Sequence, residues 1–575
     1  MLTSFRRKTT MTLKDLRWKS GMTQKQAADF LGVSLRAYQT YEKSEDKAET
    51  EKYKSFCARL ASIRREEQSS GFHVNVVLGD GLSAMTEHVK PWDKRTVYPS
   101  LKKYLDGDDS GRVCVLYGLR RTGKTTLLLQ AIDDLPKEES VYIKIRVTDR
   151  MADLLQDLKR LQSLGYRYVF IDEVTLMEDF IDSASALSDI YAMMGMKIVL
   201  SGTDSLGFWI SLSDELYDRA YLLHTTFIPY AEYARLLGKE DVDEYIRYGG
   251  TLRMGDNDFD DDDAQAPDAS FRNDESTRRY IDTAICRNIQ RSLECYKNGT
   301  HFMALQDLYR ANELTGAINR VIERANHEFL LKVLTENFKS HDLGSAKQLL
   351  SKQQNFILET IDIDDVTRRL MRLLEIKNQE EQSVLLNEEH LRQIETYLKA
   401  LGLVENCEVR YEMGKSRDYP IFTQPGMRYC QALALTHSLL KDEEFLSHTP
   451  AQQDVVIQKI SEDVMGRMLE DIVLLETRKA LSKQRYEVFK FIFAVGEYDM
   501  VVFDKESNDC SVFEVKHSGE LSPAQKRHLQ DPEKQGVIEA RIAPIAHKIV
   551  LYRGEDKTDA SGIEYKNVEN YLKGL

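Results

Sequence analysis

One short segment combines glycines, a lysine and a hydroxyl in a spacing that can hold phosphate groups. Gly118-Leu-Arg-Arg-Thr-Gly-Lys-Thr125 follows the apolar run 113–117 and precedes a run of good helix formers. Glycines let successive backbone N–H groups turn toward phosphate oxygens, and the N-terminus of the next helix adds partial positive charge. Lys124 is expected to contact the β- and γ-phosphates, and the Thr125 hydroxyl to coordinate Mg²⁺. We therefore predict a P-loop that binds ATP, formed by Gly118, Leu119, Arg120, Arg121, Thr122, Gly123, Lys124, Thr125 and Thr126.

An apolar run that ends in two acids, Tyr168-Val-Phe-Ile-Asp172-Glu173, follows the P-loop along the chain. Asp172, at the C-terminal end of a buried strand, is expected to bind Mg²⁺ directly or through water. Glu173 is expected to polarise the attacking water. Many strands end in a solvated acidic turn, but after a P-loop this pair predicts hydrolysis rather than binding alone.

Two further positions can act on the γ-phosphate. The run 198–201 leads into Thr203 and Asp204, either of which can sense that phosphate, although a helix N-cap is the alternative. Arg219 precedes the apolar run 221–224 and can stabilise transition-state charge on the nucleotide of a neighbouring subunit. The alternative for Arg219 is a surface salt bridge.

The elements that must position these residues form an α/β pattern. Short β-rich runs alternate with amphipathic helices from about residue 112 to 225, which is typical of a parallel sheet. We expect strands at 113–117, 141–146, 168–172, 198–201 and 221–224.

These motifs, with Leu200-Ser-Gly-Thr-Asp-Ser205, Phe227-Ile-Pro-Tyr-Ala-Glu-Tyr233 and Tyr248-Gly-Gly250, resemble the archaeal-type AAA+ ATPases of prokaryotes. The resemblance runs from about residue 96 to the C-terminus. It implies ATP and Mg²⁺ as cofactors, and an ATPase that forms hexamers or assembles transiently as a homo-oligomer. The chain has Asp218-Arg219 where the family has Gly-Arg, which weakens the case for Arg219.

A second set of charged residues lies near the C-terminus. Asp499 follows a glycine turn, and Glu514 and Lys516 lie on the next predicted strand, two residues apart and therefore on one face. Two carboxylates can hold Mg²⁺ while a lysine activates water, as phosphodiester cleavage requires. With Glu470 upstream on a helix, the pattern resembles the PD-(D/E)XK nuclease-like domain over about 455–560. A hairpin with charged residues on one face is the alternative, and such domains often persist without turnover.

The N-terminal segment 11–65 is helical by periodicity, and residues 1–65 carry 15 Lys/Arg against 7 Asp/Glu, a local charge of +8. Thr23 is expected to cap a helix over 24–31, and Ser34 a second helix over 35–42. The segment resembles the Xre/Cro-type helix-turn-helix, which implies DNA contacts by Gln24, Ser34, Arg36 and Gln39. A helical module for dimerisation is the alternative.

At 575 residues the chain is too long for one core, so a multidomain α/β protein is expected. The sequence has no run of about 18 uncharged apolar residues, so we predict no membrane span. The N-terminus has no signal-peptide pattern and the seven cysteines have no paired spacing, which together favour the cytoplasm. The expected units are a helix-turn-helix over 1–66, a linker over 67–95, an AAA+ core over 96–232, lid helices with an acidic loop over 233–300, a helical and winged-helix region over 301–449 and a PD-(D/E)XK nuclease-like domain over 450–575.

The net charge of −14 comes from the body of the chain, including the acidic run 256–263. A basic N-terminal segment on an acidic body favours a DNA-associated, ATP-hydrolysing protein that couples its end domains to the ATPase, in defence or in mobile-element control. The alternatives are an ATP-gated transcription regulator without nuclease activity, and a signalling ATPase whose end domains contact proteins only. The helix expected within 387–404 either reads DNA as part of a winged helix or packs on the ATPase.

Overall fold

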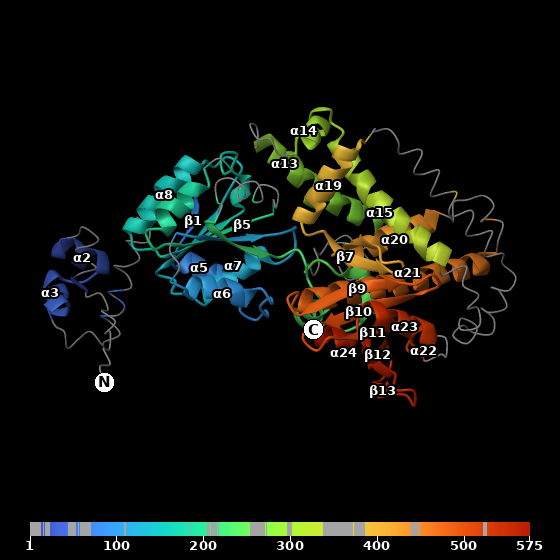
Figure 1. Ribbon diagram of the computed structural model, residues 1–575. Coiled ribbons are helices and arrows are strands. Elements are labelled where there is room, and N and C mark those ends of the chain that lie inside the picture. The colour runs from blue at the N-terminus through green and yellow to red at the C-terminus, as the bar shows by residue number, and fades with distance from the viewer. Residues whose placement is uncertain are drawn as a thin grey trace.

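The computed structural model describes residues 23–43, 71–108, 111–181, 183–203, 218–252, 273–295, 302–336, 386–438, 449–520 and 526–575, with single residues at 13, 14, 17, 53, 55, 57, 208, 216, 271, 372 and 446. Two sheets dominate these parts of the chain, with helices between them (Figure 1). The predicted Asp204 and the acidic run 256–263 lie outside the described residues.

The first sheet has six strands in the order β1-β3-β4-β5-β2-β6. β2 to β6 are mutually parallel, and β1 alone runs antiparallel, beside β3. The parallel α/β arrangement confirms the fold class predicted for this part of the chain. The strands are β1 Asn75–Val77, β2 Val113–Tyr117, β3 Ser140–Lys144, β4 Tyr168–Asp172, β5 Lys197–Gly202 and β6 Ala220–His224.

Side chains of these strands alternate between two cores, as the pleat of a strand requires. On β2, Val113 and Val115 join one core while Cys114 and Leu116 join the other. Helices cover both faces, α8 on one and α5, α6 and α7 on the other (Figure 1). Their bounds are α5 Asp80–Glu87, α6 Tyr98–Asp106, α7 Lys124–Asp133 and α8 Met151–Ser163, and two short turns, η2 Val174–Leu176 and η3 Leu187–Ala192, follow β4.

Residues 67–95, which we expected to form a linker, contain β1 and α5. β1 pairs with β3 and forms one edge of the sheet, and Leu82 of α5 is fully buried in the sheet's core. A three-residue strand is too short to show a periodicity, so β1 carries no signal in the sequence.

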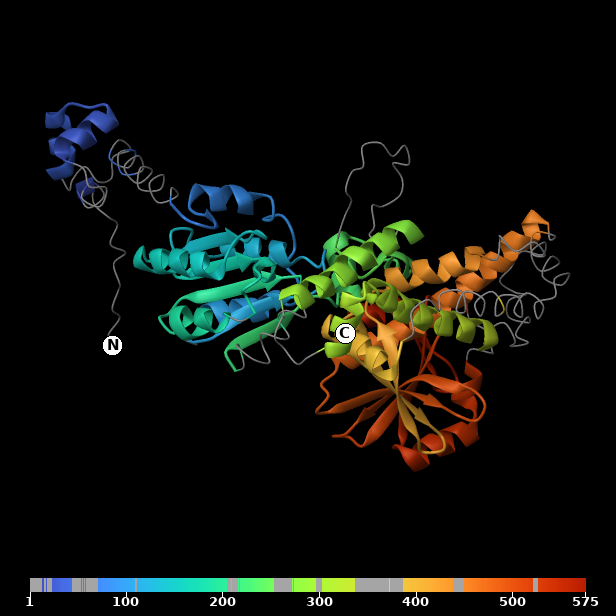
Figure 2. The same cartoon turned by 90° about the horizontal axis from the view of Figure 1, so that it is seen from above.

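Helices fill the region between the two sheets (Figure 2). Gly402, just after α19, has a φ of +67°, and a Cβ there would lie 1.9 Å from the His224 ring of β6. Only glycine allows this approach, so the segment expected as a winged helix packs on the ATPase sheet. The helices are α10 Tyr230–Leu237, α11 Val242–Tyr248, α12 Asp274–Tyr280, η4 Ile281–Cys286, α13 Arg287–Cys295, α14 Met303–Arg310, α15 Leu314–Glu336, α19 Glu388–Ala400 and α20 Pro425–Ser438.

The second sheet has eight strands in the order β13-β14-β12-β11-β10-β9-β7-β8. Its β7–β8 hairpin comes from the segment before residue 449, and β7 runs parallel to β9. The domain boundary predicted between residues 449 and 450 therefore separates β7 from β9, although the two strands pair in one sheet. The strands are β7 Val404–Tyr411, β8 Ser416–Phe422, β9 Tyr486–Ile492, β10 Glu497–Asp504, β11 Asp509–Val515, β12 Ile545–Tyr552, β13 Lys557–Thr558 and β14 Glu564–Asn567.

One long helix, α21 Pro450–Ala480, packs against this sheet and begins with a capping box between Thr449 and Gln452. Its C-terminal half is buried on most sides, with apolar side chains such as Leu469 and Val473 in the core and buried carboxylates at Asp471 and Glu476. The remaining helices here are α22 Arg527–Gln530, α23 Pro532–Arg541 and α24 Val568–Lys573.

At the N-terminal end, α2 Gln24–Leu31 and α3 Leu35–Lys43 have nearly the bounds expected from the sequence. Thr23 and Gln26 form a capping box, and Ala27 and Tyr38 are fully buried where the two helices meet. Whether this pair belongs to the helix-turn-helix class stays a prediction. None of the helices in the described parts of the chain is long and apolar enough to cross a membrane.

Candidate functional site

The P-loop connects β2 to α7, and its backbone is shaped by glycine. Gly118 has a φ of +147°, and a Cβ at that position would lie 2.5 Å from the Thr225 hydroxyl, so no larger residue fits. The Lys124 ammonium donates to the carbonyls of Gly118 at 2.9 Å and Leu119 at 2.7 Å. Burial lowers the pKa of Lys124 to about 8. The lysine is thus held inside the loop by neutral acceptors, which an anionic ligand can replace.

Asp172 lies at the same edge of the sheet, fully buried at the end of β4. Its Oδ1 accepts from Ser201 at 2.6 Å, and its Oδ2 accepts from Thr125 at 3.1 Å. Oδ2 also accepts from Tyr142 and Lys144, each at 2.8 Å. Burial alone would raise the pKa of Asp172, but the Lys144 charge and these hydrogen bonds bring it below its ordinary value. The predicted Mg²⁺ ligands Thr125 and Asp172 are therefore neighbours.

Glu173 and Thr203 also come together. Thr203 donates to Glu173 Oε2 at 3.3 Å, and Glu173 has a φ of +60° where the chain leaves β4. The Thr203 carbonyl accepts from Asn288 of α13 at 3.1 Å. This arrangement places the predicted water-polarising carboxylate next to the predicted γ-phosphate sensor, and it links the sensor to the helical region.

Arg219 forms an ion pair with Asp189 at 2.9 Å, and both side chains are more than 40% exposed. This is the surface pair that the sequence offered as the alternative. The role of Arg219 at a neighbouring subunit's nucleotide stays a prediction.

Several contacts behind the P-loop had no signal in the sequence. Arg95, before α6, donates to the Thr122 carbonyl at 2.7 Å and is paired with Glu232 of α10 at 2.8 Å. The backbone N–H of Leu252 donates to the Arg121 carbonyl at 2.8 Å. Since each contact joins residues far apart in the chain, only the fold brings them together.

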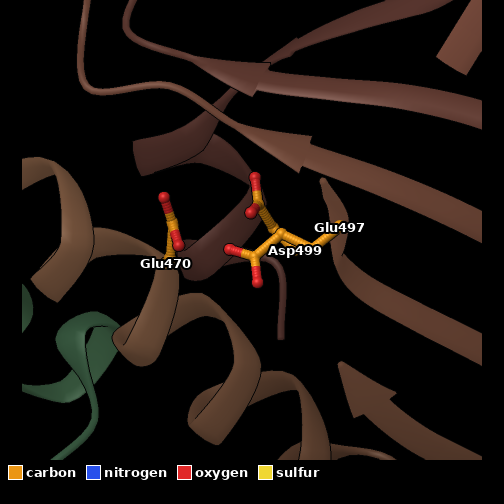
Figure 3. A group of neighbouring side chains, drawn as sticks. All are labelled: Glu470, Glu497 and Asp499. Carbon is orange, nitrogen blue, oxygen red and sulfur yellow. The ribbon is translucent and has the colours of Figure 1, made fainter. Parts of the chain in front are cut away.

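The C-terminal carboxylates converge beside α21 (Figure 3). Glu470 of α21 and Glu497 and Asp499 of β10 each place a carboxylate oxygen within 4.8 Å of the others. Asp499 also accepts from the backbone N–H of Val515 at 2.7 Å, which fixes it beside β11. The sequence pointed to Asp499 and Glu470 but missed Glu497, although its spacing of two residues from Asp499 on a strand puts both on one face.

Glu514 and Lys516 lie next to this cluster. Lys516 Nζ is 2.8 Å from Glu514 Oε2 and 3.7 Å from Asp499 Oδ2, so the three predicted residues are brought together. Glu514 is only 2% exposed, and its Oε1 has no hydrogen-bond partner. Burial raises the pKa of Glu514. An unpaired buried carboxylate oxygen beside three other carboxylates is suited to a cation.

Two further cations neutralise part of this charge. Lys490 Nζ is 2.6 Å from Glu497 and 3.2 Å from Glu470, and Arg467 contacts the same two carboxylates at 2.8 Å and 2.9 Å. Burial and the nearby Asp499 raise the pKa of Glu470. The sequence did not single out Lys490 or Arg467. With Lys516, they place three cations beside the four carboxylates.

Helix α11 and the C-terminal domain are joined by ion pairs. Asp243 is 2.7 Å from His517 and 2.9 Å from Arg553, and Asp241 is 2.8 Å from Arg553. His517 directly follows Lys516. Beyond the C-terminal end of α11, the backbone N–H of Leu252 donates to the Arg121 carbonyl of the P-loop. The segment 241–252 therefore contacts both the P-loop and the residue that follows Lys516.

A buried carboxylic acid reinforces this junction. Glu476, six residues after Glu470 in α21, accepts from the Tyr230 N–H at 2.8 Å and from the Tyr245 hydroxyl at 3.0 Å. Burial raises the pKa of Glu476 to about 8 although both hydrogen bonds oppose that rise. The carboxyl is therefore largely protonated at neutral pH.

The N-terminal helices bring two of the predicted DNA-contacting residues together. Gln39 of α3 donates to Gln24 of α2 at 3.1 Å, and Gln24 in turn donates to Glu42. Ser34 accepts from the Ala37 N–H at 3.3 Å as the expected cap, and Arg36 is exposed. The glutamine side chains are thus oriented by a neighbour rather than free to rotate.

Residues 110–234 match the family model described as an AAA domain. This segment contains β2 to β6 and the P-loop, so the AAA+ part of the sequence prediction is confirmed. No curated protein matches the chain. The helix-turn-helix and the nuclease-like domain stay predictions.

Among solved structures, the chain is similar to the Aeropyrum pernix Orc1 protein in complex with DNA, at 15% identity and a TM-score of 0.23, over 63% of this chain and 96% of that one. It is also similar to the Saccharomyces cerevisiae Hsp104–ADP complex, at 14% identity and a TM-score of 0.20, over 73% of this chain and 50% of that one. These scores are too low to transfer a function, which must come from this chain's own residues.

Replacing Glu476 by glutamine tests the buried acid. Because its folded pKa of about 8 lies above the ordinary 4.5, its contribution to stability is full below pH 4.5 and is lost as the pH rises through 8. Glu476→Gln keeps an acceptor for Tyr230 and Tyr245 but cannot ionise. We expect it to unfold like the wild type at pH 4 and to gain about 1 kcal/mol or more at pH 8, measured by calorimetry. Glu462→Gln, at an exposed position of the same helix, should show no such pH dependence.

Proposed function

We propose that this chain is a Mg²⁺-dependent ATPase that associates with DNA. The observation that carries the ATPase proposal is the meeting of Lys124, Thr125, Asp172 and Glu173 at one edge of a parallel sheet. Phosphoryl transfer to water needs a phosphate cradle, a metal site and a group that orients the water, and these residues supply all three.

Each residue has a defined task in this proposal. Lys124 exchanges the carbonyls of Gly118 and Leu119 for phosphate oxygens, which are stronger acceptors for an ammonium. Thr125 and Asp172 would hold Mg²⁺, which when bound neutralises charge on the phosphates. Glu173 orients the attacking water and takes up its proton, while Thr203 holds the Glu173 carboxylate in place.

The DNA proposal rests on the N-terminal helices. The segment 1–65 has a local charge of +8, and exposed Arg36 lies on α3 with Gln39, which Gln24 orients. A helix that presents a pre-oriented amide and a guanidinium is suited to base edges in the major groove. Defence against foreign DNA or control of mobile elements fits such a protein, and an ATP-gated transcription regulator is the alternative.

A second candidate activity, metal-dependent DNA cleavage, is favoured by one specific observation. The Glu514 side chain is buried, and its Oε1 has no hydrogen-bond partner. It lies near Asp499, Glu470 and Lys516, so carboxylates that can bind a metal ion stand beside a lysine. The order helix, three antiparallel strands, helices and a parallel strand from α21 to β12 agrees with the predicted PD-(D/E)XK core. Through α11, nucleotide state at the P-loop can influence the position of Lys516.

Lys124→Ala tests the ATPase proposal. Loss of the ammonium removes the main positive charge of the phosphate cradle, so we expect kcat/KM for Mg²⁺-ATP to fall about a hundredfold or more. Phosphate release with ATP and Mg²⁺ measures this. Lys137→Ala, which removes a surface pair with Asp133 at the end of α7, should leave turnover unchanged. Equal turnover in wild type and Lys124→Ala would refute the proposal.

Retention of duplex DNA by the full chain tests the N-terminal module. Arg36→Ala combined with Gln39→Ala should weaken binding by about tenfold or more and reduce its dependence on salt, because a cation and a base contact are both lost. Fluorescence anisotropy at several salt concentrations gives both quantities. Arg310→Ala, at an exposed position of α14, is the control. If the full chain binds no DNA at low salt, the proposed association with DNA is refuted and the ATPase proposal is unaffected.

The nuclease candidate is tested with plasmid and linear DNA in Mg²⁺ or Mn²⁺. Asp499→Ala together with Lys516→Ala should reduce cleavage by about a hundredfold or more, since a metal ligand and the water-activating cation are removed. Asp504→Ala, on the same strand but paired with Arg485 at its far end, should cleave normally. Wild-type protein that leaves DNA intact would favour the transcription regulator.

A further inference from the structure

The predicted magnesium ligand Asp172 already has a cation beside it. Lys144, the last residue of β3, lies opposite Asp172 in the register of the two strands, and its ammonium is 2.8 Å from Oδ2. Asp172 is 1% exposed, whereas the Lys144 side chain is 39% exposed. A buried carboxylate of this kind needs a paired charge to remain ionised.

The hydrogen bonds around Oδ2 leave little room for another ligand. Thr125, Tyr142 and Lys144 all donate to this single oxygen. Direct coordination of Mg²⁺ by Oδ2 would require one of these donors to leave that oxygen. An ammonium that stayed in place would also repel the metal.

Lys144 is the donor that can leave. Tyr142 is buried in the core of the sheet, and Thr125 is itself a predicted metal ligand. The Lys144 side chain is partly exposed, and its flexible four-carbon stem can swing into solvent or toward a phosphate.

We propose that Lys144 is an internal cation that competes with Mg²⁺ for Asp172 and thereby sets how strongly nucleotide binding depends on the metal. The inference rests on the proposed nucleotide site and names a positioning residue that the P-loop motifs do not include. With Lys144 on Asp172, the carboxylate is neutralised and a nucleotide can enter without metal. Direct coordination of Mg²⁺ by Asp172 would release Lys144 from the carboxylate.

The test measures ADP affinity of the full chain by calorimetry, from chelator to saturating Mg²⁺. Lys144→Gln keeps a hydrogen-bond donor for Asp172 but lacks the competing charge. We expect the Mg²⁺ concentration that gives half of the metal-dependent gain in affinity to fall about fivefold or more. Lys144→Arg retains the charge and should behave like the wild type, as should Lys137→Gln on the surface of the same domain.

Unfolding temperature gives a second readout that does not require turnover. Without metal, Lys144→Gln should unfold below the wild type, because Asp172 loses its counter-charge, and the difference should disappear with Mg²⁺ and ADP. An unchanged or higher half-saturating Mg²⁺ concentration in Lys144→Gln would overturn the competition. Wild-type protein that binds no ADP at any Mg²⁺ concentration would instead overturn the proposed nucleotide site, and the inference with it.

Discussion

The ionised carboxylate of Asp172, buried at the end of β4, is the constraint on which the nucleotide half of the molecule depends. A charge so far from water is tolerated only when donors surround it. Those donors come from β3, from β5 and from the first turn of α7, so satisfying one carboxylate draws three strand ends and the P-loop helix to the same place. The same requirement that stabilises the fold therefore assembles the candidate metal site.

The two halves of the chain are joined through packing rather than through a flexible connection. α19 reaches the ATPase sheet where Gly402 meets His224, and α11 carries ion pairs to the C-terminal domain. α21 contributes Glu470 to one candidate site and Glu476 to the contact with α10 and α11. Helices α10 and α11 therefore contact the same long helix that carries Glu470.

Sequence reasoning succeeded where the physical signal is local. The P-loop, the acids after β4, and the bounds of α2 follow from short motifs, from caps and from periodicity, and the structure has them in the expected places. It failed for Lys144, Lys490 and Arg467, because each owes its position to a strand or helix far away in the chain. Glu497 is an intermediate case, since its spacing from Asp499 carried a signal that went unused.

The pairing of β7 with β9 has a consequence for how the C-terminal part can exist. Because the β7–β8 hairpin supplies the neighbour of β9, a fragment that begins at residue 450 would keep α21 and the carboxylates but leave β9 as a bare strand edge. Unprotected edges recruit strands from other molecules. The eight-stranded sheet therefore needs the segment before α20 as well as residues 450–575, and a fragment that keeps this sheet intact must begin at the β7–β8 hairpin.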